Sequence, residues 1–402
     1  MRLRGKKTGM HISNRQLFLQ HVAQTSPAPV GLEIISAKGI YLKDESGKEY
    51  IDLISGISVS NIGHCHPAVV EAVKKQAETH MHLMVYGEYV QSTQVELAKA
   101  LTDLLPKNLN SVYFVNSGSE ATEGALKLAK RVTGRSEIIS CKNSYHGSTH
   151  GALSVMGSED FKTAYRPLLP DVRTIEFNKE EDLLQITSKT ACIITEVVQS
   201  EAGVIKAEID YLKKLRARCN EVGALLIFDE VQTGFGRTGT FFAFEQYNLA
   251  PDILTLGKGM GGGMPIGAFV SSNEIMKSLT HTPVLGHMTT FGGHPVCCAA
   301  ALANLKVISE NKLHERAKEI GIILKQELHH PKIKELRVCG ALAAVDLGDE
   351  TTNMQSIQKC IETGVITDWF LFNIQSMRIA PPLTISNEEL KKACQIIVNS
   401  II

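Results

Sequence analysis

Residues 209–229 read IDYLKKLRARCNEVGALLIFD, and this stretch decides the fold class. Its first part, Ile209–Val222, carries apolar residues at helical spacing, whereas Ala224–Phe228 is a short, continuous apolar run typical of a buried strand. A helix joined to a strand that is apolar on both faces indicates a parallel sheet covered by helices. The stretch therefore predicts an α/β protein.

The same alternation of strands and helices continues on both sides of this stretch, beginning near residue 60. A further helical pattern occurs at Glu120–Val132. Further apolar runs of strand length occur at Ser111–Val115, Glu137–Ser140, Ala191–Thr195, Ile253–Leu256 and Ile266–Ser271. Together they predict one parallel sheet, and in such sheets the binding site lies outside the carboxyl ends of the strands.

The two ends of the chain have a different pattern. The first forty residues are polar and irregular, with one expected short helix, and Gly39–Leu53 reads as a hairpin that turns at Asp44–Lys48. Beyond about residue 305 we expect helices, strands within Arg337–Leu347 and a closing helix at Asn387–Ile402. The predicted domains are an N-terminal arm and hairpin (1–60) that joins the small domain, a large domain (61–305) and a C-terminal small domain (306–402).

Composition argues against several classes of protein. The 402 residues include 42 Lys+Arg and 42 Asp+Glu, so a net charge of zero provides no field that attracts nucleic acid or an anionic membrane. No run reaches about 18 apolar residues, and no apolar segment follows the basic N-terminal residues, so we expect neither a membrane span nor a secretory signal. Nine cysteines without a C-x-x-C pattern favour a reducing, cytoplasmic compartment.

Polar and small residues follow five of the predicted strands. Because the carboxyl ends of parallel strands meet at one edge of a sheet, we expect these segments to form a single large site. The five segments are Asn116–Glu120, Asn143–Gly147, Glu196–Glu201, Asp229–Gln232 and Gly257–Gly259.

Three of these segments carry residues with a specific chemical capacity. Backbone N–H groups at a helix start, together with Ser117, Gly118 and Ser119, suit a phosphate, although plain helix capping explains the same residues. A carboxylate such as Asp229 stabilises a protonated ring nitrogen placed beside it. Lys258 follows a buried strand in a glycine-rich turn, where desolvation favours a neutral amine able to form a Schiff base; a surface lysine is the alternative.

Two other motifs suggest different chemistry. Gly234–Gly239 (GFGRTG) matches the G-x-G-x-x-G pattern of dinucleotide sites, which makes an oxidoreductase an alternative. That pattern follows its strand directly in such folds, whereas here Asp229 and Glu230 intervene and would repel a pyrophosphate. His64 and His66 lie only two residues apart and no further cluster has ligand spacing, so we expect a packed loop and no metal site.

Taken in order, the motifs resemble those of the class III (omega) aminotransferases, which include acetylornithine, ornithine and 4-aminobutyrate aminotransferases. The resemblance extends from about Gly39 to the C-terminus. The six motifs that carry it are Ser117–Glu120, Tyr145–Gly147, Ile227–Gly239, Asp252–Gly267, Thr289–Pro295 and Arg378–Leu383.

The resemblance implies the type I aminotransferase fold, with a mainly parallel seven-stranded sheet in the large domain, and pyridoxal 5′-phosphate as the cofactor. By position, Lys258 is the Schiff-base lysine and proton-moving base, and Asp229 pairs with the pyridine nitrogen. The other implied cofactor-binding residues are Ser117, Gly118 and Ser119 at the phosphate, Tyr145 stacked on the ring, His146, Gln232 near the ring hydroxyl, and Thr290.

The resemblance also implies how substrates and subunits meet. Arg378 matches an arginine that binds a substrate carboxylate bidentately, and Glu201 matches a carboxylate that pairs with this arginine and gates it. Ser148 and Thr289 fall at implied substrate-binding positions. Thr290 matches a residue that reaches the phosphate of the neighbouring subunit, so the implied assembly is a homodimer.

Two positions depart from the family pattern. Ser148 stands where acetylornithine, ornithine and 4-aminobutyrate relatives carry an arginine that binds a carboxylate, and His294 replaces the usual asparagine. We therefore expect an aminotransferase that moves an amino group from an omega-amino acid or amine to a 2-oxo acid, either 2-oxoglutarate or pyruvate. Acetylornithine/ornithine-type specificity and an aminomutase or racemase on the same scaffold are the alternatives.

Overall fold

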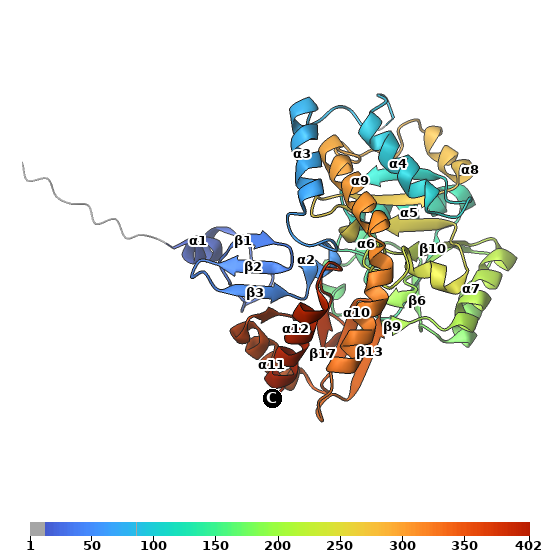
Figure 1. The fold of residues 1–402 in the computed structure, drawn as a ribbon. Coiled ribbons are helices and arrows are strands. Elements are labelled where there is room, and N and C mark those ends of the chain that lie inside the picture. The colour runs from blue at the N-terminus through green and yellow to red at the C-terminus, as the bar shows by residue number, and fades with distance from the viewer. Residues whose placement is uncertain (1–12, 86) are drawn as a thin grey trace, which may run out of the picture.

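The computed structural model describes residues 13–85 and 87–402, and a seven-stranded sheet forms its centre (Figure 1). Strands β4, β5, β7, β10 and β11 share one direction, so their carboxyl ends meet at one edge. In spatial order the strands are β4 (Ser111–Val115), β12 (Gly267–Ser271), β11 (Ile253–Leu256), β10 (Leu225–Asp229), β7 (Thr190–Thr195), β5 (Glu137–Cys141) and β6 (Val172–Ile175).

One strand departs from the parallel arrangement that the apolar runs predicted. Strand β12 pairs antiparallel with both of its neighbours, β11 and β4. The chain between Leu256 and Gly267 is too short for the crossover that a parallel pair needs, which takes about a dozen or more residues. The sheet is therefore mainly parallel, and β12 begins at the edge where β11 ends.

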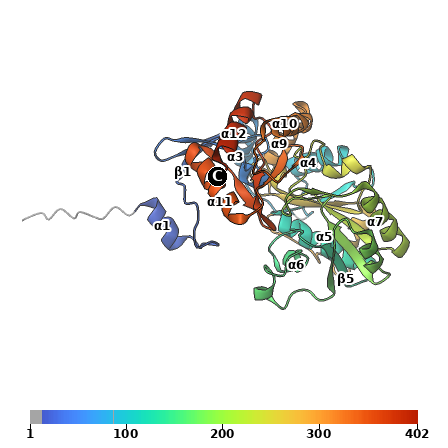
Figure 2. The same cartoon turned by 90° about the horizontal axis from the view of Figure 1, so that it is seen from below.

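Helices bury the sheet on both faces. In β10, Ile227 packs in the cluster that contains Ala125 and Leu128 of α5 (Gly118–Thr133), whereas Leu226 and Phe228 belong to the larger core on the opposite face. Figure 2 shows α5 and α9 (Pro295–Glu310) on opposite sides of the sheet. The expected burial of a continuous apolar strand on both faces is confirmed.

Local sequence explains where the helices around the sheet end. Ser117 caps α5 by accepting a hydrogen bond from the Glu120 N–H, and Gly134 ends it with a positive φ of 67°. The remaining helices are α1 (Asn14–His21), α2 (Ser55–Ser58), α3 (Pro67–Thr79), α4 (Ser92–Asp103), α6 (His150–Ser154), α7 (Ile209–Val222), α8 (Asn273–Met276), α10 (Leu313–Glu327), α11 (Glu350–Thr363) and α12 (Asn387–Ser400).

The N-terminal hairpin and the C-terminal part of the chain share a sheet. Strand β3 of the hairpin pairs in parallel with β15, which follows α11. The strands outside the central sheet are β1 (Ile34–Lys38), β2 (Tyr41–Asp44), β3 (Glu49–Asp52), β8 (Val198–Gln199), β9 (Ile205–Lys206), β13 (Glu335–Cys339), β14 (Leu342–Asp346), β15 (Val365–Ile366), β16 (Asp368–Phe370) and β17 (Asn373–Ile379). The domain limits at 60 and 305 stay predictions; α9 runs across residue 305, and residues 1–12 lie outside the described part.

Other expectations concern membranes, metals and cysteines. No helix within the described ranges is long and apolar enough to cross a membrane, and no group there of three or more His, Cys, Asp or Glu could hold a metal ion. His64 instead lies 2.7 Å from an Asp52 oxygen, and His66 caps α3. All nine cysteines are free, and all but Cys65 are buried.

Candidate active site

The five segments at the carboxyl ends of the strands line one cavity of about 170 Å³. The expectation that they form a single site is confirmed, since each of β4, β5, β7, β10 and β11 contributes the residues that follow it. The lining residues are Ser117, Gly118, Ser119, Tyr145, His146, Gly147, Glu196, Asp229, Val231, Gln232, Thr233 and Lys258.

One end of this cavity is formed by the N-terminus of α5 and is suited to an anion. The helix presents the backbone N–H groups of its first turn there, and Ser119 Oγ accepts a hydrogen bond from the Ser148 N–H at 3.3 Å. Glycine is required next to it, because a Cβ on Gly147 would lie 2.3 Å from Ser119 Oγ and one on Gly118 would lie 2.6 Å from Val231. The free space between these groups is therefore preserved by glycine.

A buried carboxylate faces the cavity from the end of β10. Asp229 Oδ2 lies 2.6 Å from His146 Nδ1, and Oδ1 accepts the Val231 N–H at 2.9 Å, so both oxygens are held in place. His146 Nε2 and Gln232 Nε2 are buried and have no hydrogen-bond partner among residues 13–85 and 87–402. A ligand with polar ring substituents would satisfy them, and a protonated ring nitrogen would gain from the Asp229 charge.

Lys258 begins the short turn after β11, with a left-handed φ of 43°. Its Nζ donates to Gln232 Oε1 at 2.9 Å. Burial lowers the pKa of the Lys258 ammonium, an effect that the Glu201 carboxylate opposes. Because only the neutral amine can attack a carbonyl carbon, this direction of shift favours the reactive form.

Glu196 belongs to one of the five predicted segments, but no role was predicted for it. In the structure it lines the first cavity. It is buried at the end of β7 and accepts the N–H groups of Tyr145 at 3.2 Å and Ser200 at 3.0 Å. Burial raises the pKa of Glu196 to about 7; His146 opposes this shift and Asp229 adds to it. Its position directly after a buried strand, like that of Asp229, is the signal that could have found it.

A second cavity of about 360 Å³ adjoins the first and shares Tyr145 and Lys258 with it. Its other lining residues are Ile57, Glu201, Asp368, Trp369, Leu371 and Arg378. Sequence reasoning missed Asp368 and Trp369, because they lie on β16, far along the chain from the segments that follow the central strands. A ligand bound in the first cavity would thus meet a ligand in the second at Lys258.

Arg378 and Glu201 form a buried bidentate ion pair in this second cavity. Both terminal nitrogens of Arg378 donate to the two Glu201 carboxylate oxygens at 2.9 Å, and one of them also donates to the Trp369 carbonyl at 2.7 Å. The Leu371 N–H donates to Glu201 at 3.1 Å. The ring of Phe370 lies under the guanidinium, with 4.7 Å between its centroid and Arg378 Cζ. The predicted pairing of these two residues is present in the structure.

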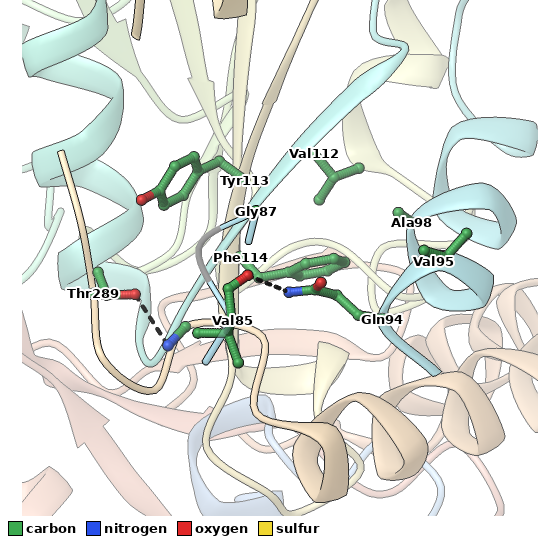
Figure 3. A pocket seen from close by; sticks show the side chains of 10 residues that line it. Val85, Gly87, Gln94, Val95, Ala98, Val112, Tyr113, Phe114 and Thr289 are labelled. Carbon is green, nitrogen blue, oxygen red and sulfur yellow. Dashed lines mark hydrogen bonds between the residues drawn. The ribbon is translucent and has the colours of Figure 1, made fainter. Parts of the chain in front are cut away.

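The remaining predicted site residues do not line these two cavities. Ser148 is exposed beside them, with its Oγ 3.1 Å from the Tyr145 hydroxyl. Thr289 lines a separate pocket of about 280 Å³, where its Oγ accepts the Gly292 N–H at 3.0 Å (Figure 3). Thr290 is exposed and lines none of these pockets.

The glycine-rich segment Gly234–Gly239 packs against the C-terminal part of the chain. A Cβ on Gly236 would lie 3.2 Å from Leu383, and Arg237 is fully buried, where it donates to the carbonyls of Ala341 and Pro381. The packing of this segment therefore explains its glycines, and no nucleotide site is needed to explain them.

Comparison with known proteins extends the likeness to most of the chain. The family model "Aminotransferase class-III" matches residues 22–401. An acetylornithine aminotransferase of Methanocaldococcus jannaschii is 42% identical over 89% of this chain and 90% of its own, and one of Bacillus cereus is 38% identical over 91% and 94%. An ornithine aminotransferase structure from Toxoplasma gondii ME49 superposes with a TM-score of 0.88 and 31% identity, covering 96% of this chain and 93% of that one.

A cofactor-bound structure is also similar. An amine transaminase from an uncultivated Pseudomonas species, solved with pyridoxal 5′-phosphate, superposes with a TM-score of 0.87 and 27% identity over 95% of this chain and 97% of that one. The site fits that cofactor, since one cavity is lined by a helix N-terminus suited to an anion, a buried carboxylate, a lysine, and two residues with buried polar atoms that have no hydrogen-bond partner in the described part of the chain. The chain is a member of the class III aminotransferases, enzymes that use pyridoxal 5′-phosphate.

Proposed function

We propose that the enzyme moves an amino group from an amine or omega-amino acid to a 2-oxo acid, with Lys258 acting between two adjoining cavities. The observation that carries this proposal is that Tyr145 and Lys258 line both the cavity suited to the cofactor and the one closed by Arg378 and Glu201. A bound substrate and a bound cofactor would therefore meet at the lysine amine.

The first cavity holds the cofactor through groups already oriented by the fold. The N-terminus of α5, with Gly118 and Ser119, would bind its phosphate, and Ser117 fixes the start of that helix. Asp229, oriented by His146, stabilises the protonated ring nitrogen. Pyridoxal 5′-phosphate, when bound, supplies an electron-withdrawing ring that stabilises negative charge on a substrate carbon.

Three further side chains act on the reacting atoms. Tyr145 would cover one face of a bound ring, and Gln232, which accepts from the Lys258 amine at 2.9 Å, would hydrogen-bond near the ring hydroxyl. Lys258 would hold the cofactor, and its amine, when free and neutral, would accept the proton of the substrate's reacting carbon. A depressed lysine pKa suits this exchange, because the amine must be neutral to accept the proton.

Arg378 and Glu201 serve the two half-reactions in different states. A 2-oxo acid carboxylate matches the two guanidinium nitrogens that Glu201 now occupies, so Glu201 has to leave before the acid binds. In the amine half-reaction the pair stays closed, and Arg378 then carries no free charge. This arrangement lets one cavity accept an acid and an amine in turn.

Acetylornithine-type specificity is the second candidate, favoured by the names of relatives up to 42% identical. Ser148 weighs against it, because a hydroxyl cannot replace an arginine in binding a distal carboxylate. An aminomutase on the same scaffold would form product without an added 2-oxo acid. These three activities use the same cofactor residues; the two aminotransferases differ in their amino donor, and the aminomutase differs in needing no second substrate.

We also propose a cytoplasmic homodimer in which Thr290, next to the predicted substrate-binding residue Thr289, completes the partner's site. Both threonines lie outside the cofactor cavity of their own chain. Apolar side chains are exposed at residues 89–90 and 284–291, and a second copy of the chain would cover them. They include Tyr89, Val90, Val284, Met288 and Phe291. Nine free cysteines suit a reducing compartment.

A half-reaction screen tests the function. Purified holoenzyme is mixed with one amino donor at a time, without acceptor, and the visible absorbance of the bound cofactor is followed. Conversion by glutamate and by amines or omega-amino acids, but not by acetylornithine or ornithine, is the expected result. Conversion by acetylornithine would establish the second candidate, and a protein without a lysine-linked chromophore after addition of cofactor would contradict the site.

A further inference from the structure

Asp368 is a carboxylate of the second cavity that the proposed mechanism does not use. It begins β16 and lines the cavity together with Trp369, Glu201 and Arg378. Its Oδ1 lies 3.1 Å from Arg378 Nε, yet this oxygen is buried and accepts a well-aligned hydrogen bond from no residue in the described part of the chain. The two atoms form an ion pair, but neither has a well-aligned hydrogen-bond partner among residues 13–85 and 87–402.

The charges around the cavity do not balance. Arg378 carries one positive charge, and both of its terminal nitrogens are already bound to Glu201. Asp368 therefore brings a second negative charge to a guanidinium that Glu201 has neutralised. The Lys258 amine, the remaining cation of the lining, is committed to the cofactor, and the other lining side chains of this cavity are uncharged.

The direction of the pKa shift of Asp368 agrees with an excess of negative charge in this cavity. Burial raises its pKa to about 7; Arg378 opposes the shift, whereas Glu201 and Asp52 add to it. An additional cation within about 4–6 Å would restore the ionised carboxylate.

We propose that Asp368 binds a second ammonium group of the amine donor, so that the preferred donors are diamines without a carboxylate. This rests on the proposed function, in which the donor enters while Arg378 and Glu201 are paired. A primary amine of the donor reacts at Lys258 in the first cavity, and its distal ammonium occupies the second beside Asp368. A distal carboxylate would instead meet Asp368, with Arg378 occupied and Ser148 uncharged.

The competing explanation is that Asp368 only orients the Arg378 guanidinium through Nε. The two explanations differ in which substrates bind more weakly when the Asp368 charge is removed. An orienting residue affects every ligand of Arg378, above all the 2-oxo acid. A residue that binds a distal ammonium affects diamines alone.

The test compares the holoenzyme with Asp368→Asn, a variant of nearly the same shape without the charge. The amine half-reaction is followed by rapid-mixing absorbance with 1,4-diaminobutane, butylamine and 4-aminobutyrate, and with diamines of three to six carbons. We expect the wild-type enzyme to prefer the diamine over butylamine. The variant should lose this preference by about ten- to a hundredfold, mainly in apparent affinity, and its butylamine and 2-oxoglutarate reactions should weaken by a much smaller factor.

Two further variants keep the proposal open to refutation if Asp368→Asn is poorly folded. Asp368→Glu retains the charge and should retain part of the diamine preference. Ser148→Arg adds a cation beside Tyr145 and should shift preference toward 4-aminobutyrate. Equal losses with diamine, butylamine and 2-oxoglutarate in Asp368→Asn, or a wild-type enzyme that treats diamine and butylamine alike, would overturn the proposal while leaving the aminotransferase intact. If glutamate also fails to change the absorbance, the proposed function itself is wrong.

Discussion

Replacing Gly147 by alanine tests the geometry of the phosphate end of the site. Gly147 has a φ of 125°, and an added Cβ would lie 2.3 Å from Oγ, 2.8 Å from Cβ and 2.9 Å from Cα of Ser119. The last of these atoms is backbone, so the first turn of α5 has to shift. Because that turn is proposed to bind the cofactor phosphate, Gly147→Ala should weaken cofactor binding.

The expected magnitude has two parts. A side chain at this positive φ costs about 1–3 kcal/mol of folding free energy wherever it occurs. The overlap with Ser119 is specific to this position, and losing one charge-assisted hydrogen bond to a phosphate costs about 1.5–3 kcal/mol. The cofactor dissociation constant should therefore rise about ten- to a hundredfold.

The assay removes the cofactor and titrates it back while the visible absorbance is recorded. Gly263→Ala is the matched control, since Gly263 also has a positive φ, of 106°, but a Cβ there would have nothing within 4 Å. Both variants should lose folding stability, and only Gly147→Ala should lose cofactor affinity. Wild-type affinity in Gly147→Ala, or equal losses in both variants, would refute the reasoning.

Three other substitutions test separate parts of the site. Lys258→Ala should abolish turnover and leave the cofactor removable by gel filtration, and an active variant would contradict the mechanism. Arg378→Met should lower the free energy of unfolding, measured in urea, by about 3–5 kcal/mol, because it leaves buried carboxylates unpaired. Adding Glu201→Met should restore part of this free energy. A single variant as stable as the wild-type protein would argue against a buried pair. The pKa of Asp368 is raised to about 7, so the native state binds this proton more tightly than the unfolded chain does. Asp368→Asn should therefore gain stability relative to the wild-type protein as the pH rises from about 4 to about 7, and a constant difference would contradict the shift.

Local pattern and residue type predicted much of the large domain. Strands β4 and β11 and helix α7 lie where the apolar periodicity placed them, because each is a clean run or face bounded by polar or small residues. Strand β6 (Val172–Ile175) was not predicted, since it lies at the sheet edge and exposes Arg173 and Thr174. The direction of β12 depends on the length of its connection rather than on its composition.

The site could be predicted only where it follows the central strands. Asp229 and Lys258 each follow a buried strand, so a sheet edge brings them together without further information. Asp368 and Arg378 come from β16 and β17, and no local pattern shows that these strands reach the same cavity. Thr290 lines none of the three cavities described, and its proposed contact lies between subunits, so one chain alone does not relate it to a site.

The position of Trp369 gives the enzyme an intrinsic optical probe. The chain contains one tryptophan, and it lines the second cavity beside Asp368 and Leu371. All indole fluorescence therefore comes from this cavity, without contributions from elsewhere in the protein. Emission intensity and wavelength should respond to substrate binding, to displacement of Glu201, and, by energy transfer, to the chromophore held at Lys258. Ligand binding can thus be followed by fluorescence without a label. This holds for carboxylic acids that bind without reacting as well as for substrates.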